Sequence, residues 1–344
     1  MSASPFILIQ EVAPRDGLQM EKCFVETEDK IALINALATA GFSRIEVSSF
    51  VSPKAIPALR DAAEVFAGIQ RRADTIYVAL VPNPKGAERA MLAKVDEINL
   101  VMSASDTHNR ANMGMTRDAS LVGFKSIVET VRGSGVSINA TIATAFGCPF
   151  EGAQPVSKID AIIDAYLNLG VNGITLADTT GMANPRQVGD LVSHVLKQVS
   201  ANQLTLHFHN TRGLGVSNVM LAWQSGAHRF DAALGGLGGC PFAPGASGNI
   251  CTEDLVSMCA EMGVQTGLDL DALLTLSRKL PALVGHDVPG QVAKAGPPSH
   301  RGGPGLLDSL AATISYSLVP ITPPVSCSPP SPPPGHAPAV VMAD

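Results

Sequence analysis

Eight short apolar segments alternate with amphipathic helical segments along most of the chain, and this alternation restricts its fold more than any other feature. The eight segments are rich in Val, Ile and Leu, as expected of parallel strands that are covered on both faces. They are predicted at 6–12, 44–48, 75–81, 97–102, 137–143, 173–177, 204–209 and 229–234. The pattern predicts the α/β class, and eight repeats favour a closed (β/α)8 TIM barrel over an open doubly wound sheet.

Residues between the strands carry signals for helix starts. Asn184 followed by a proline predicts a cap and a first helical turn. Ser157 and Asp160 resemble a capping box, which predicts a helix start ahead of 162–169. No G-x-G-x-x-G motif follows the first predicted strand, so a dinucleotide-binding fold has little support.

The composition changes sharply near the C-terminus. A further helical stretch is predicted at 270–283, and residues 1–295 are expected to form one catalytic barrel domain with its terminal helices. From 296 to 344 the chain is rich in Pro, Ser and Gly and almost uncharged. Such a segment buries too little apolar surface to fold alone, so we expect a disordered tail in which 306–319 could form one short helix.

Charge and cysteine usage exclude several classes of partner. The net charge of −6 gives no electrostatic footprint for nucleic acid. The first predicted strand begins at Phe6, and no apolar stretch is long enough to span a membrane, so we expect neither a targeting peptide nor a membrane anchor. The six cysteines are scattered without a C-x-x-C pair, which predicts reduced thiols and a cytoplasmic protein.

Two histidines on one predicted strand are the sharpest chemical signal. His207 and His209 project to the same side because strand side chains alternate, and Phe208 points to the other side. Strands 1, 7 and 8 are neighbours in a closed barrel, so Asp16 and Asn249 can join the pair. Two imidazoles and a carboxylate suit a metal ion, although hydrogen bonds to interior carboxylates are the alternative. The ligand types fit zinc, iron, magnesium or manganese, so an iron(II) oxygenase is a rival interpretation.

Two further segments are expected at the mouth of the barrel. Residues 235–249 are rich in glycine and carry Cys240 between Gly239 and Pro241, which is typical of a mobile cover that presents a thiol. An unreactive cysteine in a flexible loop is the alternative. Arg15 could orient a carbonyl or carboxylate through paired donors, or it could pair with an interior glutamate, Glu11 or Glu46.

Five motifs together resemble the hydroxymethylglutaryl-CoA lyase family over roughly residues 6 to 295. They lie at 13–19 (APRDGLQ), 49–54 (SFVSPK), 146–152 (FGCPFEG), 207–209 (HFH) and 235–249 (GGLGGCPFAPGASGN). The stretch GLGGCPF in the last of these is similar to the active-site signature of the family. Related acetyl-CoA-condensing Claisen synthases share the histidines but lack this cysteine loop.

The resemblance implies a set of site residues and a cofactor. It implies Mg²⁺ or Mn²⁺ held by Asp16, His207, His209 and Asn249. It also implies a catalytic Cys240, a substrate-contacting Arg15 with Gln19 in the same motif, and acidic residues around the site at Glu11, Glu46 and Asp178.

The reaction implied is the retro-Claisen cleavage of 3-hydroxy-3-methylglutaryl-CoA to acetyl-CoA and acetoacetate, a step of leucine degradation and ketone-body chemistry. Asp178 is the first candidate for the base and a metal-activated water the second; Glu11 and Glu46 would orient Arg15. Asn210 departs from the Asp that often follows the second histidine in the family. Residues 103–112 resemble relatives that act on citramalyl-CoA or on longer 3-hydroxy-3-alkylglutaryl-CoA esters. A Claisen synthase and a non-catalytic barrel are the alternatives from other classes, and we expect a homodimer.

Overall fold

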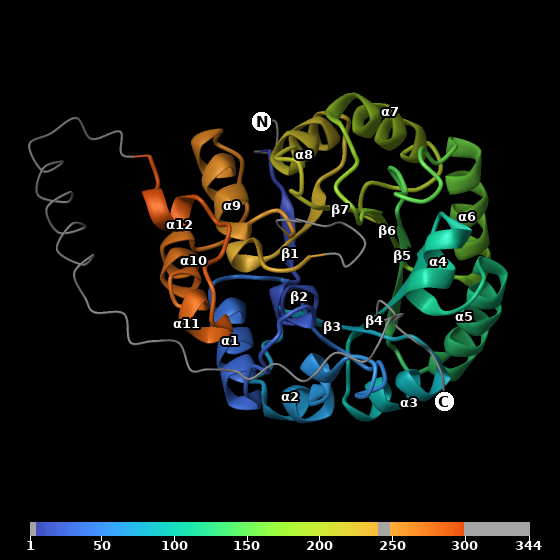
Figure 1. The fold of residues 1–344 in the computed structure, drawn as a ribbon, viewed down its shortest axis with the longest axis horizontal. Coiled ribbons are helices and arrows are strands. Elements are labelled where there is room, and N and C mark those ends of the chain that lie inside the picture. Colours follow the sequence, from blue (N-terminus) through green and yellow to red (C-terminus); the bar gives the residue numbers. More distant parts are fainter. Residues whose placement is uncertain (1–4, 240–247, 299–344) are drawn as a thin grey trace, which may run out of the picture.

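Eight parallel strands close into a barrel in the computed structural model of the chain, which describes residues 5–239 and 248–298 (Figure 1). Each strand pairs with the next one in sequence, and β1 pairs with β8 to close the ring. The strands are β1 Leu8–Glu11, β2 Arg44–Ser49, β3 Ile76–Leu80, β4 Glu97–Ser103, β5 Ser137–Ala143, β6 Gly173–Asp178, β7 Leu204–Phe208 and β8 Arg229–Ala232. The predicted TIM barrel is therefore confirmed, with one observed strand inside or across each predicted segment.

The strands form because their residues are buried on both faces. All five residues of β7 are buried, and β4 and β6 are buried along nearly their whole length. Leu204, Leu206 and Phe208 face the surrounding layer, where the ring of Phe208 lies 5.6 Å from that of Phe146. The side chains on the other face of each strand fill the barrel interior, and those at one end of the barrel form the site.

Helices surround the strands, and three short helices near the C-terminus lie outside α9 and α1 (Figure 1). The helices are α1 Thr27–Thr39, α2 Ala62–Gly68, α3 Pro84–Leu92, α4 Asp106–Met113, α5 Arg117–Val131, α6 Val156–Leu169, α7 Pro185–Val195, α8 Gly215–Gln224, α9 Thr252–Glu261, α10 Leu270–Ser277, α11 Leu280–Val284 and α12 Val292–Ala295. The predicted helical extension at 270–283 is therefore present, but it is divided between α10 and α11.

One of the two predicted helix starts is correct. Asn184 caps α7, where its side chain accepts a hydrogen bond from the backbone of Gln187. The capping box at Ser157 is wrong, because α6 already begins at Val156. Asp160 therefore lies inside the helix, and its carboxylate contacts a histidine on α7 instead.

Some expectations fall outside the described part of the chain. The tail from residue 299 onward, with its predicted helix at 306–319, is not described. The expectation of reduced thiols holds for Cys148, Cys251 and Cys259, but it is wrong for Cys23, which is disulfide-bonded. Within the described ranges, no helix combines the length and the apolar character needed to cross a membrane.

Candidate active site

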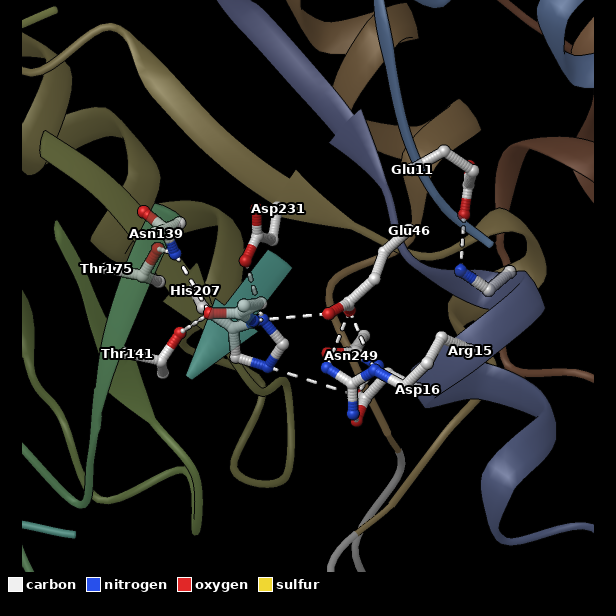
Figure 2. Close-up of polar contacts among 12 residues, drawn as sticks. Glu11, Arg15, Asp16, Glu46, Asn139, Thr141, Thr175, His207, Asp231 and Asn249 are labelled. Carbon is white, nitrogen blue, oxygen red and sulfur yellow. Dashed lines mark hydrogen bonds and ion pairs between the residues drawn. The ribbon is translucent and has the colours of Figure 1, made fainter. Parts of the chain in front are cut away.

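Arg15 and Asp16 lie on a single π-helical turn, Ala13–Gly17, directly after β1. The carbonyl of Val12 accepts hydrogen bonds from the backbone N–H groups of Asp16 at 2.7 Å and of Gly17 at 3.2 Å. Single π-helical turns of this kind are frequent at functional sites. This turn holds both charged side chains beside His207 (Figure 2).

The two histidines meet Asp16 at this end of the barrel. His207 lies on β7 and His209 directly follows it, and their Nε2 atoms are 3.1 Å apart. Asp16 Oδ2 lies 4.0 Å from the Nε2 atom of each histidine. The structure therefore brings together the three residues that the alternation of strand side chains and the closure of the barrel predict, with one ligand atom from each within 4.8 Å of the others.

Asp231 on β8 orients the first histidine, and the sequence interpretation missed it. Its Oδ2 lies 3.1 Å from His207 Nδ1, so the N–H of this nitrogen is held there and Nε2 faces Asp16. The sequence did show an acidic residue in a short apolar strand. It did not show which residue this carboxylate would contact, because that depends on the strand register, which pairs His207 with Asp231 across β7 and β8.

The charges of the cluster favour a cation. Burial alone would raise the pKa of Asp16, but the guanidinium of Arg15 and the two imidazoles hold it at about 2. Burial and the neighbouring His207 lower the pKa of His209 to about 4. Burial also acts against charging His207, yet its hydrogen bond to Asp231 raises its pKa above the usual value. At neutral pH the site therefore holds an ionised carboxylate and a neutral His209.

Asn249 reaches the same cluster from the end of the glycine-rich loop. Its Nδ2 donates to Asp16 Oδ2 at 2.7 Å and to the carbonyl of Leu237 at 3.0 Å. Gly238 leaves space for this amide, since a Cβ there would lie 2.6 Å from Asn249 Nδ2 and the backbone has φ +113°. Asn249 thus fixes the carboxylate of Asp16, and its own role as a metal ligand stays a prediction.

These residues fit a divalent cation. Without an ion, the two close imidazole nitrogens can form at most one hydrogen bond with each other. A cation between them could instead bind both nitrogens and the carboxylate. Asp231 supplies the outer partner that metal-bound histidines usually have. Their role as ligands is a proposal that the geometry supports.

Arg15 is held between two carboxylates. Its Nη1 donates to Asp16 Oδ1 at 2.7 Å, and its Nε and Nη2 lie 2.7 Å and 2.6 Å from Glu46 Oε2. Of the two interior glutamates that the sequence offered, Glu46 is the partner. Arg15 as a whole residue is only 8% exposed, and it lines the pocket beside Asp16 (Figure 2).

Glu11 lies elsewhere, so its predicted place beside Arg15 and the substrate needs correction. One oxygen accepts the backbone N–H groups of Ala13 and Leu234 at 2.8 and 2.9 Å, and the other accepts the hydroxyl of Thr252 at 2.9 Å. Glu11 is fully buried, and burial raises its pKa to about 8. It joins the end of β1 to the segment after β8 and to the start of α9.

A pocket with a cavity volume of about 130 Å³ lies over these residues and opens to solvent at its mouth. Its polar lining on the metal side comprises Arg15, Asp16, Gln19, His207, His209 and Asp231. Gln19 lines the pocket, and its contact with the substrate stays a prediction. Cys240 lies outside the described residues, so its predicted role in the site stays a prediction.

Asp178 lies at the end of β6, behind the pocket wall that Ala177 and Thr179 form. Its Oδ1 accepts the backbone N–H groups of Met182 and Ala183. Its Oδ2 has no hydrogen-bond partner among the residues that the structure describes. Burial raises the pKa of Asp178 to about 6, although the two backbone donors oppose the shift. It is therefore poised to exchange a proton near neutral pH.

Comparisons with known proteins agree with this geometry. The HMGL-like family model matches residues 7–280. The hydroxymethylglutaryl-CoA lyase YngG of Bacillus subtilis is 42% identical over 285 residues, which are 83% of this chain and 95% of the relative. An (R)-citramalyl-CoA lyase of Chloroflexus aurantiacus is also 42% identical, over 85% of this chain and 95% of its own length.

A solved structure is similar over the same region. It is an HMG-CoA lyase from Acinetobacter baumannii in complex with coenzyme A and 3-methylmalate, with 62% sequence identity and a TM-score of 0.85. The match covers 88% of this chain and 99% of the other. With a family model that spans most of the barrel and relatives that match it almost from end to end, the chain belongs to the HMGL-like family.

Proposed function

We propose that this chain is a carbon–carbon lyase that cleaves 3-hydroxy-3-methylglutaryl-CoA to acetyl-CoA and acetoacetate with Mg²⁺ or Mn²⁺ as its cofactor. The observation that carries the proposal is the cluster of Asp16, His207 and His209 at the mouth of the barrel, with Arg15 fixed beside it. Hydroxymethylglutaryl-CoA lyases among the relatives support the choice of substrate.

The cation would be held by Asp16 and the two histidines, with Asn249 as the expected fourth ligand. When bound, it supplies a Lewis acid that acidifies a hydroxyl group and neutralises carboxylate charge. The chain's own residues supply the remaining interactions. In the substrate, the C3 hydroxyl loses its proton and the C2–C3 bond breaks, which gives the ketone of acetoacetate and the enolate of acetyl-CoA.

Arg15 stabilises the negative charge that develops on the thioester oxygen as this bond breaks. Because Glu46 and Asp16 hold the guanidinium before the substrate arrives, little reorganisation is needed during the reaction. The expected magnitude is large: removing one well-placed donor of this kind costs on the order of 10²-fold in turnover.

Asp178 is the proposed base for the hydroxyl proton. Its free Oδ2 and raised pKa suit this role, and its place behind Ala177 and Thr179 means that one intervening water would relay the proton. Cys240 is proposed, on the resemblance alone, to return a proton to the enolate carbon. Cytoplasmic location and a homodimer also stay predictions.

A second substrate class is favoured by one observation. The (R)-citramalyl-CoA lyase is as similar to this chain as the lyase of Bacillus subtilis, at 42% identity each. The side group at C3 of the acyl-CoA is therefore the feature of the substrate that most needs a test.

The test is a panel of acyl-CoA esters incubated with purified protein and Mg²⁺ or Mn²⁺. The panel holds 3-hydroxy-3-methylglutaryl-CoA, citramalyl-CoA and longer 3-alkyl analogues, and mass spectrometry follows the ketone and acetyl-CoA products. We expect the highest kcat/KM for the methylglutaryl ester. A higher kcat/KM for citramalyl-CoA would change the substrate, and acetyl-CoA consumption with a 2-oxo acid would replace the lyase by a Claisen synthase.

A further inference from the structure

Neutral polar side chains form a row inside the barrel, in which Asn139, Thr141 and Thr175 lie close together (Figure 2). Asn139 on β5 donates through Nδ2 to Thr175 Oγ1 at 2.9 Å and to Asn99 Oδ1 at 3.0 Å. Thr141 Oγ1 also donates to Asn99 Oδ1, at 2.9 Å. Asn99 lies on β4, and its Nδ2 donates to Glu46 Oε1 at 3.1 Å. The row ends at Glu46, which lies on β2. We call these four neutral residues with Glu46 the interior network.

The amide of Asn99 is oriented by its neighbours. Its oxygen receives two donors, one from Asn139 and one from Thr141, so its nitrogen is left to face Glu46. The reverse orientation would place the NH₂ group against the NH₂ group of Asn139 and the oxygen against the carboxylate of Glu46, which loses both of these hydrogen bonds, whereas the hydroxyl of Thr141 can either donate or accept. Asn99 therefore acts as a directed donor to one oxygen of Glu46.

The other oxygen of Glu46 holds Arg15. Because Oε2 receives both Nε and Nη2 of the guanidinium, the position of this carboxylate sets the position of Arg15. Glu46 is only 1% exposed, and burial raises its pKa while Arg15 and Asn99 oppose the shift. Each donor to this buried carboxylate thus keeps it ionised and in place.

The backbone leaves room for the network. Gly173 begins β6 next to Asn139, and a Cβ there would lie 2.7 Å from Asn139 Oδ1, too close for the amide to stay where it is. Asn99 and Thr141 also line the pocket, whereas Asn139 is not among the residues that line it. The network therefore extends from the pocket wall to a part of the barrel that the pocket does not reach.

We propose that Asn99 is a positioning residue for the reaction: oriented by Asn139 and Thr141, it holds Glu46 so that Glu46 aims Arg15 at the substrate. The kinetic side of this inference rests on the proposed lyase function. Its structural side, the immobilisation of Arg15, does not depend on turnover and can be measured separately.

The kinetic test compares Asn99→Leu with the wild-type holoenzyme. The leucine is similar in size but cannot donate to Glu46, so we expect kcat to fall by about 10-fold while KM stays within about twofold, since a small misplacement of a catalytic group can cost this much. Asn139→Leu removes one donor that orients Asn99 and should lower kcat by about threefold. Thr205→Val, on β7 and outside the network, is the matched control with unchanged kcat.

A double-mutant cycle separates positioning from direct contact with substrate. In a Glu46→Gln background, Asn99→Leu should lower kcat by less than about twofold more, because the route to Arg15 is already broken. A full additional 10-fold loss, or a rise in KM with unchanged kcat, would overturn the proposal and assign Asn99 to the substrate. Thermal melting checks each fold, and Asn139→Leu carries the test if Asn99→Leu does not fold.

The structural test follows the Nε–H proton of Arg15 by ¹H–¹⁵N NMR, with the signal assigned by its loss in Arg15→Lys. We expect this proton to exchange with water about 10-fold faster in Asn99→Leu than in wild type, and at the wild-type rate in Thr205→Val. Unchanged exchange in Asn99→Leu would overturn the network. A wild-type protein with no cleavage of any ester would instead overturn the proposed function, so the two failures are distinguishable.

Discussion

A single neighbour decides what His207 can bind. The carboxylate of Asp231 takes the N–H of Nδ1 and so leaves Nε2 to face Asp16 and His209. Arg15 illustrates the same dependence, because it is aimed by Glu46 on one side and Asp16 on the other. At the scale of residues, the chemistry of the site therefore depends also on Asp231 and Glu46, which are not among the proposed ligands of the cation.

The role of Asp231 gives a first prediction. Asp231→Asn keeps the shape but weakens the hydrogen bond to His207 Nδ1, and we expect the affinity for Mn²⁺ to fall about 10- to 100-fold. Isothermal titration calorimetry measures it. The matched control is Asp160→Asn, which alters another Asp–His pair, to His194 between α6 and α7. Equal Mn²⁺ affinity in the wild type and Asp231→Asn would contradict the assigned role.

Asp178 gives a prediction about pH. Its pKa is raised to about 6, so it is an ionised base above that pH and a protonated acid below it. We expect kcat/KM of the wild type to fall as the pH drops through about 6. Asp178→Asn should lose on the order of 10²-fold in kcat/KM and no longer show this fall. Asp164→Asn on the exposed side of α6 is the control, and an unchanged acid limb in Asp178→Asn would exclude Asp178 as the base.

Sequence reasoning identified some of these residues and missed others for a physical reason. His207 and His209 share a face because strand side chains alternate, and Asp16 follows β1, which is next to β8 and close to β7 once the barrel closes. Asp231 and Asn99 depend on the register between neighbouring strands, which a single sequence does not specify. Glu11 was misplaced because its partners, Leu234 and Thr252, lie far away in the sequence.

At the scale of elements, local sequence signals predicted the start of one helix correctly and the start of another wrongly. Asn184 and the following proline were sufficient to predict the start of α7, because both residues act within its first turn. The pair Ser157 and Asp160 was misleading, since α6 begins with Pro155 in the capping position. No side-chain hydrogen bond caps this end of α6, so the hydroxyl of Ser157 does not mark where the helix starts.

The cap of α7 gives a prediction at this scale. Asn184→Ala removes the hydrogen bond to the backbone of Gln187, and we expect the free energy of unfolding to fall by about 1 kcal/mol. Lyase activity should be unchanged, because neither Asn184 nor any residue of α7 is among those that line the pocket. Urea denaturation measures the change, and Asn184→Asp, which can still accept the hydrogen bond, is the control. Equal destabilisation by both substitutions would contradict the capping role.

Glu11 joins three elements and gives a prediction about stability. Its folded pKa of about 8 lies above the ordinary 4.5, so its stabilising contribution is complete below pH 4.5 and is lost as the pH rises toward 8. Glu11→Gln does not titrate there. We therefore expect its free energy of unfolding, relative to wild type, to increase between pH 5 and 8, as measured by urea denaturation. Glu28→Gln on the exposed side of α1 should show no such change, and a pH-independent difference for Glu11→Gln would refute the raised pKa.

At the scale of the whole molecule, the barrel could be predicted because its signal is repeated. Eight apolar segments separated by helices leave few arrangements in which every strand is covered on both faces. Closure between β1 and β8 then places the ends of β1, β7 and β8 around one axis. The C-terminal helices α10 to α12 were harder to divide, because they pack on the outside of the barrel and carry no repeated pattern.

Dependence of cleavage on a divalent cation is the central claim, and removal of the metal tests it most directly. Purified protein is treated exhaustively with a chelator, and acetyl-CoA and acetoacetate formed from 3-hydroxy-3-methylglutaryl-CoA are measured by mass spectrometry before and after Mg²⁺ or Mn²⁺ is added back. We predict that both products disappear on chelation and return with the cation, and that neither returns in Asp16→Asn. Full turnover by the chelated protein would contradict the claim.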